Sequence, residues 1–168
     1  MKKFLFALSF IFAVNLACKK IDDPNPICAC SPVQLPTLTL VLKDANQSDL
    51  LNPNNQGSYL AKDIKLFYLD ATQVEKNVNF YLRTPFSYGN QMFNFYQLHS
   101  SDILKIAAEN DQQLFTLQVG AKQFKLKITL DEKLRYKVQQ LAVDHTAAPA
   151  ETGELSAFVP NLFYLSVQ

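Results

Sequence analysis

Cysteines, histidines and clustered carboxylates are the residues of this chain that could carry chemistry. The motif Cys28-Ala29-Cys30 could serve as a redox pair or as half of a metal site. A disulfide across a single residue would be strained and easily reduced. A zinc or iron–sulfur site needs about four ligands, and the neighbouring sequence offers no histidine and no further cysteine. We therefore expect a local disulfide or free thiols in a spacer, without a metal or cofactor.

The two histidines, His99 and His145, lie far apart in the sequence. His145 follows Asp144 and precedes Glu151 and Glu154, which together supply the donor types of an Asp-His-Glu metal site. A lone histidine in a loop or at a strand end is more often solvated. We therefore expect that neither histidine binds a metal ion.

Two groups of acidic residues also resemble sites. Residues 44–49 (DANQSD) space their oxygen atoms like the start of a calcium loop, but an EF-hand needs Gly in place of Asp49 and Glu in place of Asn55. We expect an Asx-rich turn that ends a strand. Glu109 and Asp111 could mimic a glycosidase pair, although adjacent turn carboxylates are usually solvated. With no His-Glu-x-x-His, Gly-x-Ser-x-Gly or phosphate-binding glycine loop, we predict no catalytic residue and no enzyme.

The segment Arg83 to Asn90 (RTPFSYGN) carries Phe86 and Tyr88, two aromatic residues that strand alternation does not place in a core. Exposed aromatic side chains can stack on a sugar or a peptide, and the absence of Trp weakens the carbohydrate interpretation. Phe86 and Tyr88 are therefore the candidate ligand-contacting residues. Packing in the core or beneath a covering loop is the alternative.

The start of the chain is typical of an exported protein. Met1-Lys2-Lys3 is cationic, and the thirteen residues Phe4 to Leu16 are apolar apart from Ser9 and Asn15. Helix of this length spans about 20 Å, which is short for a bilayer crossing. Residues 1–17 are predicted to be a signal peptide.

Leu16-Ala17-Cys18 resembles a lipobox, the site where bacterial lipoproteins are lipidated and cleaved. Asn15 stands where Leu is usual, and relaxed lipoboxes of this kind resemble those of Bacteroidota, in which a Cys-Lys-Lys and acidic start often follows, as in Cys18 to Asp23. The resemblance implies a diacylglycerol thioether on Cys18 and an acylated amino terminus. Each buried methylene contributes about 0.8 kcal/mol, so two or three acyl chains anchor a protein durably. The alternative is a secreted protein cleaved near Ala17.

Residues 18–34 are predicted to be a tether that carries the lipid at one end. Four prolines lie between Asp22 and Pro36, and proline favours an extended, semi-rigid chain. The expected location is the cell envelope, as an outer-membrane lipoprotein that faces the periplasm or the cell surface.

The charge balance argues against a nucleic-acid partner. The chain has 16 basic and 15 acidic residues, and loss of Lys2 and Lys3 with the leader leaves 14 against 15. A nucleic-acid-binding domain would show a basic surface instead. Thirteen Phe and seven Tyr indicate a folded domain.

Residues 35–168 are predicted to form a single all-β domain, because apolar residues recur with period two. The alternation is found in Thr37–Lys43, Asp63–Leu69, Val78–Leu82, Met92–Leu98 and Leu162–Val167. It is clearest from Leu114 to Val143, where turns at Gly120-Ala121 and Asp131-Glu132, with alternation continuing through Leu134 and Tyr136, predict an antiparallel meander. Ser101 to Glu109 also fits the helical period, with Ser100 or Ser101 as N-cap. We interpret it as a strand that turns at Asn110-Asp111.

Eight or nine short strands at this spacing favour one antiparallel β-sandwich, immunoglobulin-like in shape only. Residues 49–53 (DLLNP), 57–59 (GSY) and 63–69 (DIKLFYL) are similar to a segment of small Bacteroidota lipoproteins of uncharacterised function. In those proteins a first strand leads into the DLLNP loop and then into an IKxxYL strand. The resemblance supports the fold and the anchor and implies no activity.

The sequence therefore predicts a membrane-anchored, non-enzymatic binding or assembly module of the cell envelope. Its partner would be an envelope protein or an extracellular ligand, and loops at one end of the domain would form the contact surface. A structural accessory subunit packed on an envelope protein is the alternative. A hydrolase with an unrecognised site is the third hypothesis.

Overall fold

The computed structural model of the protein describes residues 36–167. They belong to the second of the two units into which the chain divides, residues 1–34 and residues 35–168. The predicted signal peptide (1–17), the lipid attachment at Cys18, and the tether with Cys28 and Cys30 lie outside the described residues. The described part is largely β-structure with one short α-helix.

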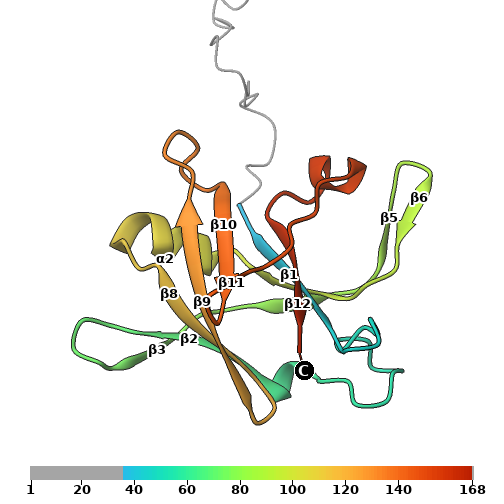
Figure 1. The fold of residues 1–168 in the computed structure, drawn as a ribbon, viewed down its shortest axis with the longest axis horizontal. Helices are drawn as coiled ribbons and strands as arrows, with labels where there is room; N and C mark the ends of the chain where they lie inside the picture. Colours follow the sequence, from blue (N-terminus) through green and yellow to red (C-terminus); the bar gives the residue numbers. More distant parts are fainter. Residues whose placement is uncertain (1–35, 168) are drawn as a thin grey trace, which may run out of the picture. The chain divides into compact units, whose positions relative to one another are not determined.

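The elements follow one another in chain order as shown in Figure 1. They are β1 (Leu38–Lys43), η1 (Ala61–Asp63), β2 (Ile64–Leu69), β3 (Glu75–Asn77), β4 (Tyr81–Arg83), β5 (Phe86–Tyr88), β6 (Gln91–Phe93), β7 (Gln97–Ser100), α2 (Asp102–Asn110), β8 (Leu114–Val119), β9 (Lys122–Leu130), β10 (Val138–Val143), β11 (Thr146–Ala147), η2 (Glu154–Ala157) and β12 (Leu162–Ser166).

The strands form three sheets, with the orders β12-β1-β7-β4, β11-β10-β9-β8-β2-β3 and β5-β6. The described residues form twelve strands, more than the eight or nine expected. The short strands β3, β5 and β11 lie outside the predicted segments, and Met92–Leu98 is divided between β6 and β7. The expectation of purely antiparallel pairing is also wrong, since β1 and β12 run parallel.

Both larger sheets contribute to one hydrophobic cluster of buried residues. Leu38, Leu40 and Leu42 of β1 lie in it, as the alternation predicts. The opposite face of β1 is covered as well, because Val41 belongs to a second, smaller cluster. This second cluster consists of Val41, Phe93, Leu155, Val159 and Leu162. Strand β1 is therefore an interior strand with two apolar faces.

Strands β8, β9 and β10 form the predicted antiparallel meander. The turn at Gly120-Ala121 is confirmed, and Gly120 has the positive φ (+59°) that favours glycine. The predicted tight turn at Asp131-Glu132 is wrong, because β10 begins only at Val138. Asp131 Oδ1 accepts the backbone N–H groups of Lys133 (2.8 Å) and Leu134 (3.0 Å), and these side-chain bonds form a loop in place of a strand ladder.

The predicted strand over Ser101–Glu109 is wrong, because these residues form the helix α2. Its buried residues Ile103, Leu104 and Ala107 follow the helical period. Ser101 occupies the N-cap position without a side-chain capping bond, and the Ile103 N–H donates instead to Ser100 Oγ (3.3 Å). Asp111 ends the helix with φ 52°, where a hairpin turn was expected. Within residues 36–167 no helix has the length and apolar character needed to cross a bilayer.

Candidate functional site

Phe86 and Tyr88, the predicted ligand-contacting residues, lie in strand β5 rather than in a loop. In the hairpin, Phe86 lies opposite Phe93 and Tyr88 opposite Gln91. Alternate residues of a strand share a face, so the two rings point to the same side of the hairpin. An isolated two-stranded hairpin is only marginally stable. Its position therefore depends on the packing of this face against the second hydrophobic cluster.

Six aromatic side chains lie in or beside that cluster, and we call them the aromatic surface. They are Phe86, Tyr88, Phe93, Phe95, Phe158 and Tyr164. The ring centroids of Phe86 and Phe93 are 5.8 Å apart, and those of Tyr88 and Phe158 are 5.4 Å apart, in tilted arrangements. Tilted aromatic pairs are favourable beyond their buried area. Phe93 is buried whereas Phe158 is 59% exposed, so the aromatic surface extends from the core to solvent.

Two cations lie over these rings. Lys43 Nζ is 4.1 Å from the Phe95 centroid and 4.7 Å from the Tyr164 centroid. The guanidinium carbon of Arg83 is 3.9 Å from the Phe86 centroid. Each such cation–π contact contributes about 0.5–1 kcal/mol at an exposed site. The aromatic surface therefore presents positive charge beside its apolar faces.

Gln91 joins the hairpin to the η2 segment. The Tyr88 hydroxyl donates to Gln91 Oε1 (2.9 Å), and Gln91 Nε2 donates to Glu154 Oε2 (3.2 Å). These bonds hold the exposed edge of the hairpin close to Phe158. Tyr88 and Phe158 form an aromatic pair at the surface.

Tyr164 forms the opposite end of the aromatic surface. Its hydroxyl donates to Glu151 Oε2 (2.5 Å), and Glu151 Oε1 accepts the Gly153 N–H (2.7 Å). Burial, and then the hydrogen bond and charge of Glu151, raise the pKa of Tyr164 far above its ordinary value. The phenol therefore stays protonated near neutral pH and donates its hydrogen bond to Glu151.

The sequence left open whether Phe86 and Tyr88 are exposed ligand contacts or packed core residues, and in the structure they are partly both. Both rings are half-buried against the second cluster, and each keeps an accessible edge. Phe158, which the sequence analysis did not single out, lies beside Tyr88 and is the more exposed ring. Its segment shows no alternation, and its contact with β5 is long-range, so no local pattern marked it.

His99 is buried in strand β7 instead of being solvated. It is 4% exposed, its Nε2 lies 3.1 Å from Gln97 Oε1, and the Tyr81 ring stacks on it at 5.2 Å. Burial, with a smaller effect of the Arg83 charge, lowers the pKa of His99 to about 4. His99 is therefore neutral at pH 7, which fits a packed structural histidine.

His145 is exposed and lies in the turn between β10 and β11. Glu151 and Glu154 are engaged elsewhere, by Tyr164 and by Gln91. Among residues 36–167 no three side chains of His, Cys, Asp or Glu are placed to hold a metal ion together. The hypothetical Asp-His-Glu site is not assembled.

The acidic segments have structural roles. Asp44 Oδ1 accepts the N–H groups of Asn46 and Ser48, both at 2.8 Å, so the predicted Asx-rich turn is confirmed. Asp49 is buried and accepts the N–H groups of Leu51 (2.9 Å) and Tyr96 (2.7 Å), which ties this loop to the segment before β7. Glu109 and Asp111 are exposed residues at the end of α2.

Comparisons of the chain with protein-family models, with curated proteins and with solved structures give no match. The aromatic surface, with its two cations and its exposed Phe158, is the candidate contact site that includes the residues predicted from the sequence.

Proposed function

We propose that this protein is a membrane-anchored, non-enzymatic binding module of the cell envelope that contacts a protein partner through the aromatic surface. The observation that carries this proposal is the exposed ring of Phe158 beside Tyr88. Aromatic side chains supported by a packed cluster offer a large contact area at low cost in side-chain entropy.

The surroundings of Phe158 favour a protein partner over a sugar. Phe158 is 59% exposed, and the rings of Phe86 and Tyr88 beside the second cluster are half-buried. Aromatic residues, Met and Arg are enriched at protein interfaces, and the Arg83 guanidinium lies over Phe86. The absence of Trp points in the same direction.

The anchor and the finer fold are part of the same proposal. Acylation of Cys18 is supported by Leu16-Ala17-Cys18 and by the resemblance to Bacteroidota lipoproteins. A sandwich of the two larger sheets, immunoglobulin-like in shape, is supported by the hydrophobic cluster to which both contribute. Anchoring near the membrane raises the effective concentration of the domain at an envelope partner.

Site-specific photo-crosslinking of the full-length protein in its own cells tests the proposal. A photoreactive phenylalanine analogue replaces Phe158 in one variant and Leu134 in the matched control, since Leu134 is also apolar and 51% exposed but lies in the 131–137 loop. We expect one discrete adduct with an envelope protein from position 158 and none from position 134. Equal adducts at both positions, or none at position 158, would contradict the proposal.

A further inference from the structure

The outer face of the six-stranded sheet carries a surface whose chemistry differs from that of the aromatic surface. On β9, Lys125 and Lys127 are exposed and alternate with the buried Leu126 and Ile128. Both lysines therefore leave the sheet on the side opposite the core. In the register of the sheet, Ala142 of β10 lies opposite Lys127.

Three adjoining open depressions lie on this face, and His145 lines all three. Their volumes are about 650, 250 and 790 Å³. We call the smallest the Lys127 pocket; its lining residues are Lys127, Thr129, Gln140, Ala142 and His145. Among the described residues that line it there is no carboxylate. Ala142, the register partner of Lys127, contributes only a methyl group to this lining.

In the described part of the chain, Lys127 lacks the ion pair that two other lysines of this sheet make. Lys65 forms an ion pair with Glu75, and Lys76 Nζ lies 3.5 Å from Asp70 Oδ2. Within residues 36–167, no ion pair joins Lys127 to a carboxylate. An ammonium group in a concave site without a counter-charge favours an anionic ligand.

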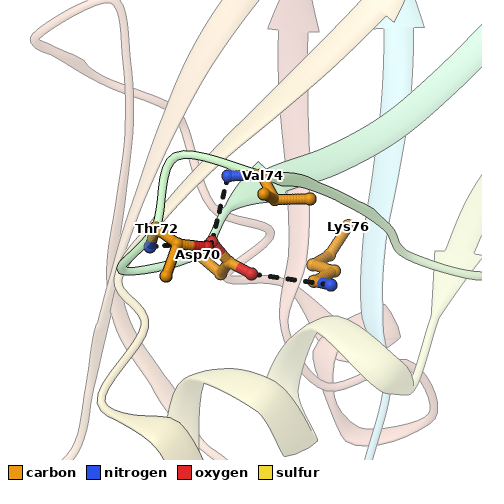
Figure 2. Close-up of polar contacts among 4 residues, drawn as sticks. All are labelled: Asp70, Thr72, Val74 and Lys76. Carbon is orange, nitrogen blue, oxygen red and sulfur yellow. Dashed lines mark hydrogen bonds and ion pairs between the residues drawn. The ribbon is translucent and has the colours of Figure 1, made fainter.

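Two acidic side chains near these depressions form hydrogen bonds within the protein. Figure 2 shows that Asp70, which lines the largest depression, is held within its own turn. Its Oδ1 accepts the Val74 N–H (3.0 Å) and the Thr72 hydroxyl (2.6 Å), and these bonds are the main reason that the pKa of Asp70 is lowered to about 2. Asp144 Oδ1 accepts the backbone N–H of Lys125 (2.8 Å).

Asp111 places a negative charge at one end of these depressions. It lines the 650 Å³ depression at the end of α2, whereas Lys127 and His145 line both that depression and the Lys127 pocket. Lys125 Nζ donates to Thr116 Oγ1 (3.0 Å), so its charge lies nearer the middle of the face. Lys127 is therefore the cation that lines the Lys127 pocket, and no carboxylate is among the described residues that line it.

The turn that presents His145 is held in a strained conformation. Asp144 and His145 have φ values of 47° and 73°. Two-residue hairpin turns of this type favour Asn-Gly or Asp-Gly, because a side chain in the left-handed region is costly. Residues held in such conformations cluster at binding sites. Here the strained residue carries the imidazole that lines the pocket.

Leu114 adds an apolar contact next to the cations. It lies opposite Lys127 in the register of β8 and β9, is 58% exposed, and lines the 650 Å³ depression. We infer that this face binds a small amphiphile with one carboxylate or phosphate group. The anionic group lies between Lys127 and His145, the hydroxyl and amide of Thr129 and Gln140 donate to it, and the apolar part covers Leu114. This site is independent of the proposed protein partner.

Titration with octyl phosphate, below its micelle concentration, tests the site. The protein is the mature chain, residues 18–168, with Cys18→Ala, so that no acyl chain competes for the pocket. Binding is followed by the NMR resonances of the two imidazole rings. His145 lines the pocket, whereas His99 is buried in β7 and serves as an internal control. We expect a saturable shift of His145 without a shift of His99, weaker binding of inorganic phosphate, and no binding of octyl glucoside.

Three variants locate the site, with circular dichroism as the check on folding. Lys127→Gln should weaken octyl phosphate binding about tenfold, because it removes a charge-assisted contact. Ala142→Leu should abolish binding by filling the pocket while it keeps the charge. Lys105→Gln, the same charge loss on the exposed face of α2, should change the affinity less than about twofold.

Several results would overturn the inference. These are an unshifted His145, equal weakening by Lys127→Gln and Lys105→Gln, or equal affinity for octyl phosphate and octyl glucoside. Binding to phosphatidylglycerol vesicles without binding to monomeric octyl phosphate would show that these lysines contact a membrane surface. That result would also contradict a binding site for a single amphiphile. Binding of the monomer with the predicted pattern of variants would support it.

Discussion

Burial of His99 determines its charge and, through that charge, the response of the protein to acid. In the unfolded chain its pKa is near 6.5, whereas in the folded protein it is lowered to about 4, chiefly by burial. Below pH 6.5 the unfolded state gains a proton that the folded state cannot take up. Stability from this residue is therefore complete above pH 6.5 and is lost as the pH falls toward 4.

We expect His99 to account for a loss of roughly 2–3 kcal/mol in the free energy of unfolding between pH 7 and pH 4.5. Urea unfolding of the wild type and of His99→Gln at both pH values measures it. Carboxylates contribute to both proteins, so the difference between the two pH dependences isolates the histidine. An imidazole of His99 that titrates near pH 6.5 in the folded protein would refute this explanation.

Asn161 connects segments from three parts of the chain. It has φ 56°, its Oδ1 accepts the Val138 N–H (2.8 Å), and its Nδ2 donates to the Tyr136 carbonyl (3.1 Å) and to the Thr37 carbonyl (3.4 Å). One side chain thus satisfies backbone groups before β1 and at the start of β10.

Replacing Asn161 separates its two roles. Asn161→Gly keeps the positive φ but removes the side-chain bonds, and it should lower the free energy of unfolding by about 1–3 kcal/mol. Asn161→Ala should cost about 1 kcal/mol more, because alanine disfavours the left-handed conformation. Denaturant unfolding of both variants checks the order. Equal stability of the two variants would contradict the backbone argument.

At the scale of elements, the clearest predictions came from residues whose local pattern and tertiary environment agree. Phe124, Leu126 and Ile128 alternate on a strand with one exposed face, and the meander is confirmed. Residues 101–109 fit the helical period, and the interpretation as a strand was wrong because Ile103, Leu104 and Ala107 are buried on one face of α2, as that period predicts. Phe158 could not be found from a local pattern, because its neighbour Tyr88 lies in a distant segment.

The end of α2 offers a test at this scale. Asp111 has φ 52°, the left-handed conformation in which glycine commonly ends a helix. Asp111→Gly should raise the free energy of unfolding by up to about 1 kcal/mol, and Asp111→Val should lower it by about 1–2 kcal/mol. Thermal unfolding of both variants is the measurement. Stabilisation by valine would show that the conformation of this residue does not limit the helix end.

At the scale of the molecule, the described domain has two surfaces with different chemistry. The aromatic surface lies at β1 and the β5–β6 hairpin, and the Lys127 pocket lies on the outer face of the sheet that contains β9 and β10. Sequence alone indicated Phe86 and Tyr88 because they interrupt an alternation. The Lys127 pocket could not be predicted from the sequence. Lysines are common on a solvated strand face, and only the strand register shows that Ala142 lies beside Lys127.

The proposal of an anchored binding module depends most on the acylation of Cys18. Metabolic labelling with an alkyne fatty acid, followed by separation of membranes from soluble material, measures it directly. We predict label and membrane association for the wild type and for the control Cys30→Ala, and the loss of both for Cys18→Ala. An unlabelled wild-type protein that is released freely from the membrane would contradict the account.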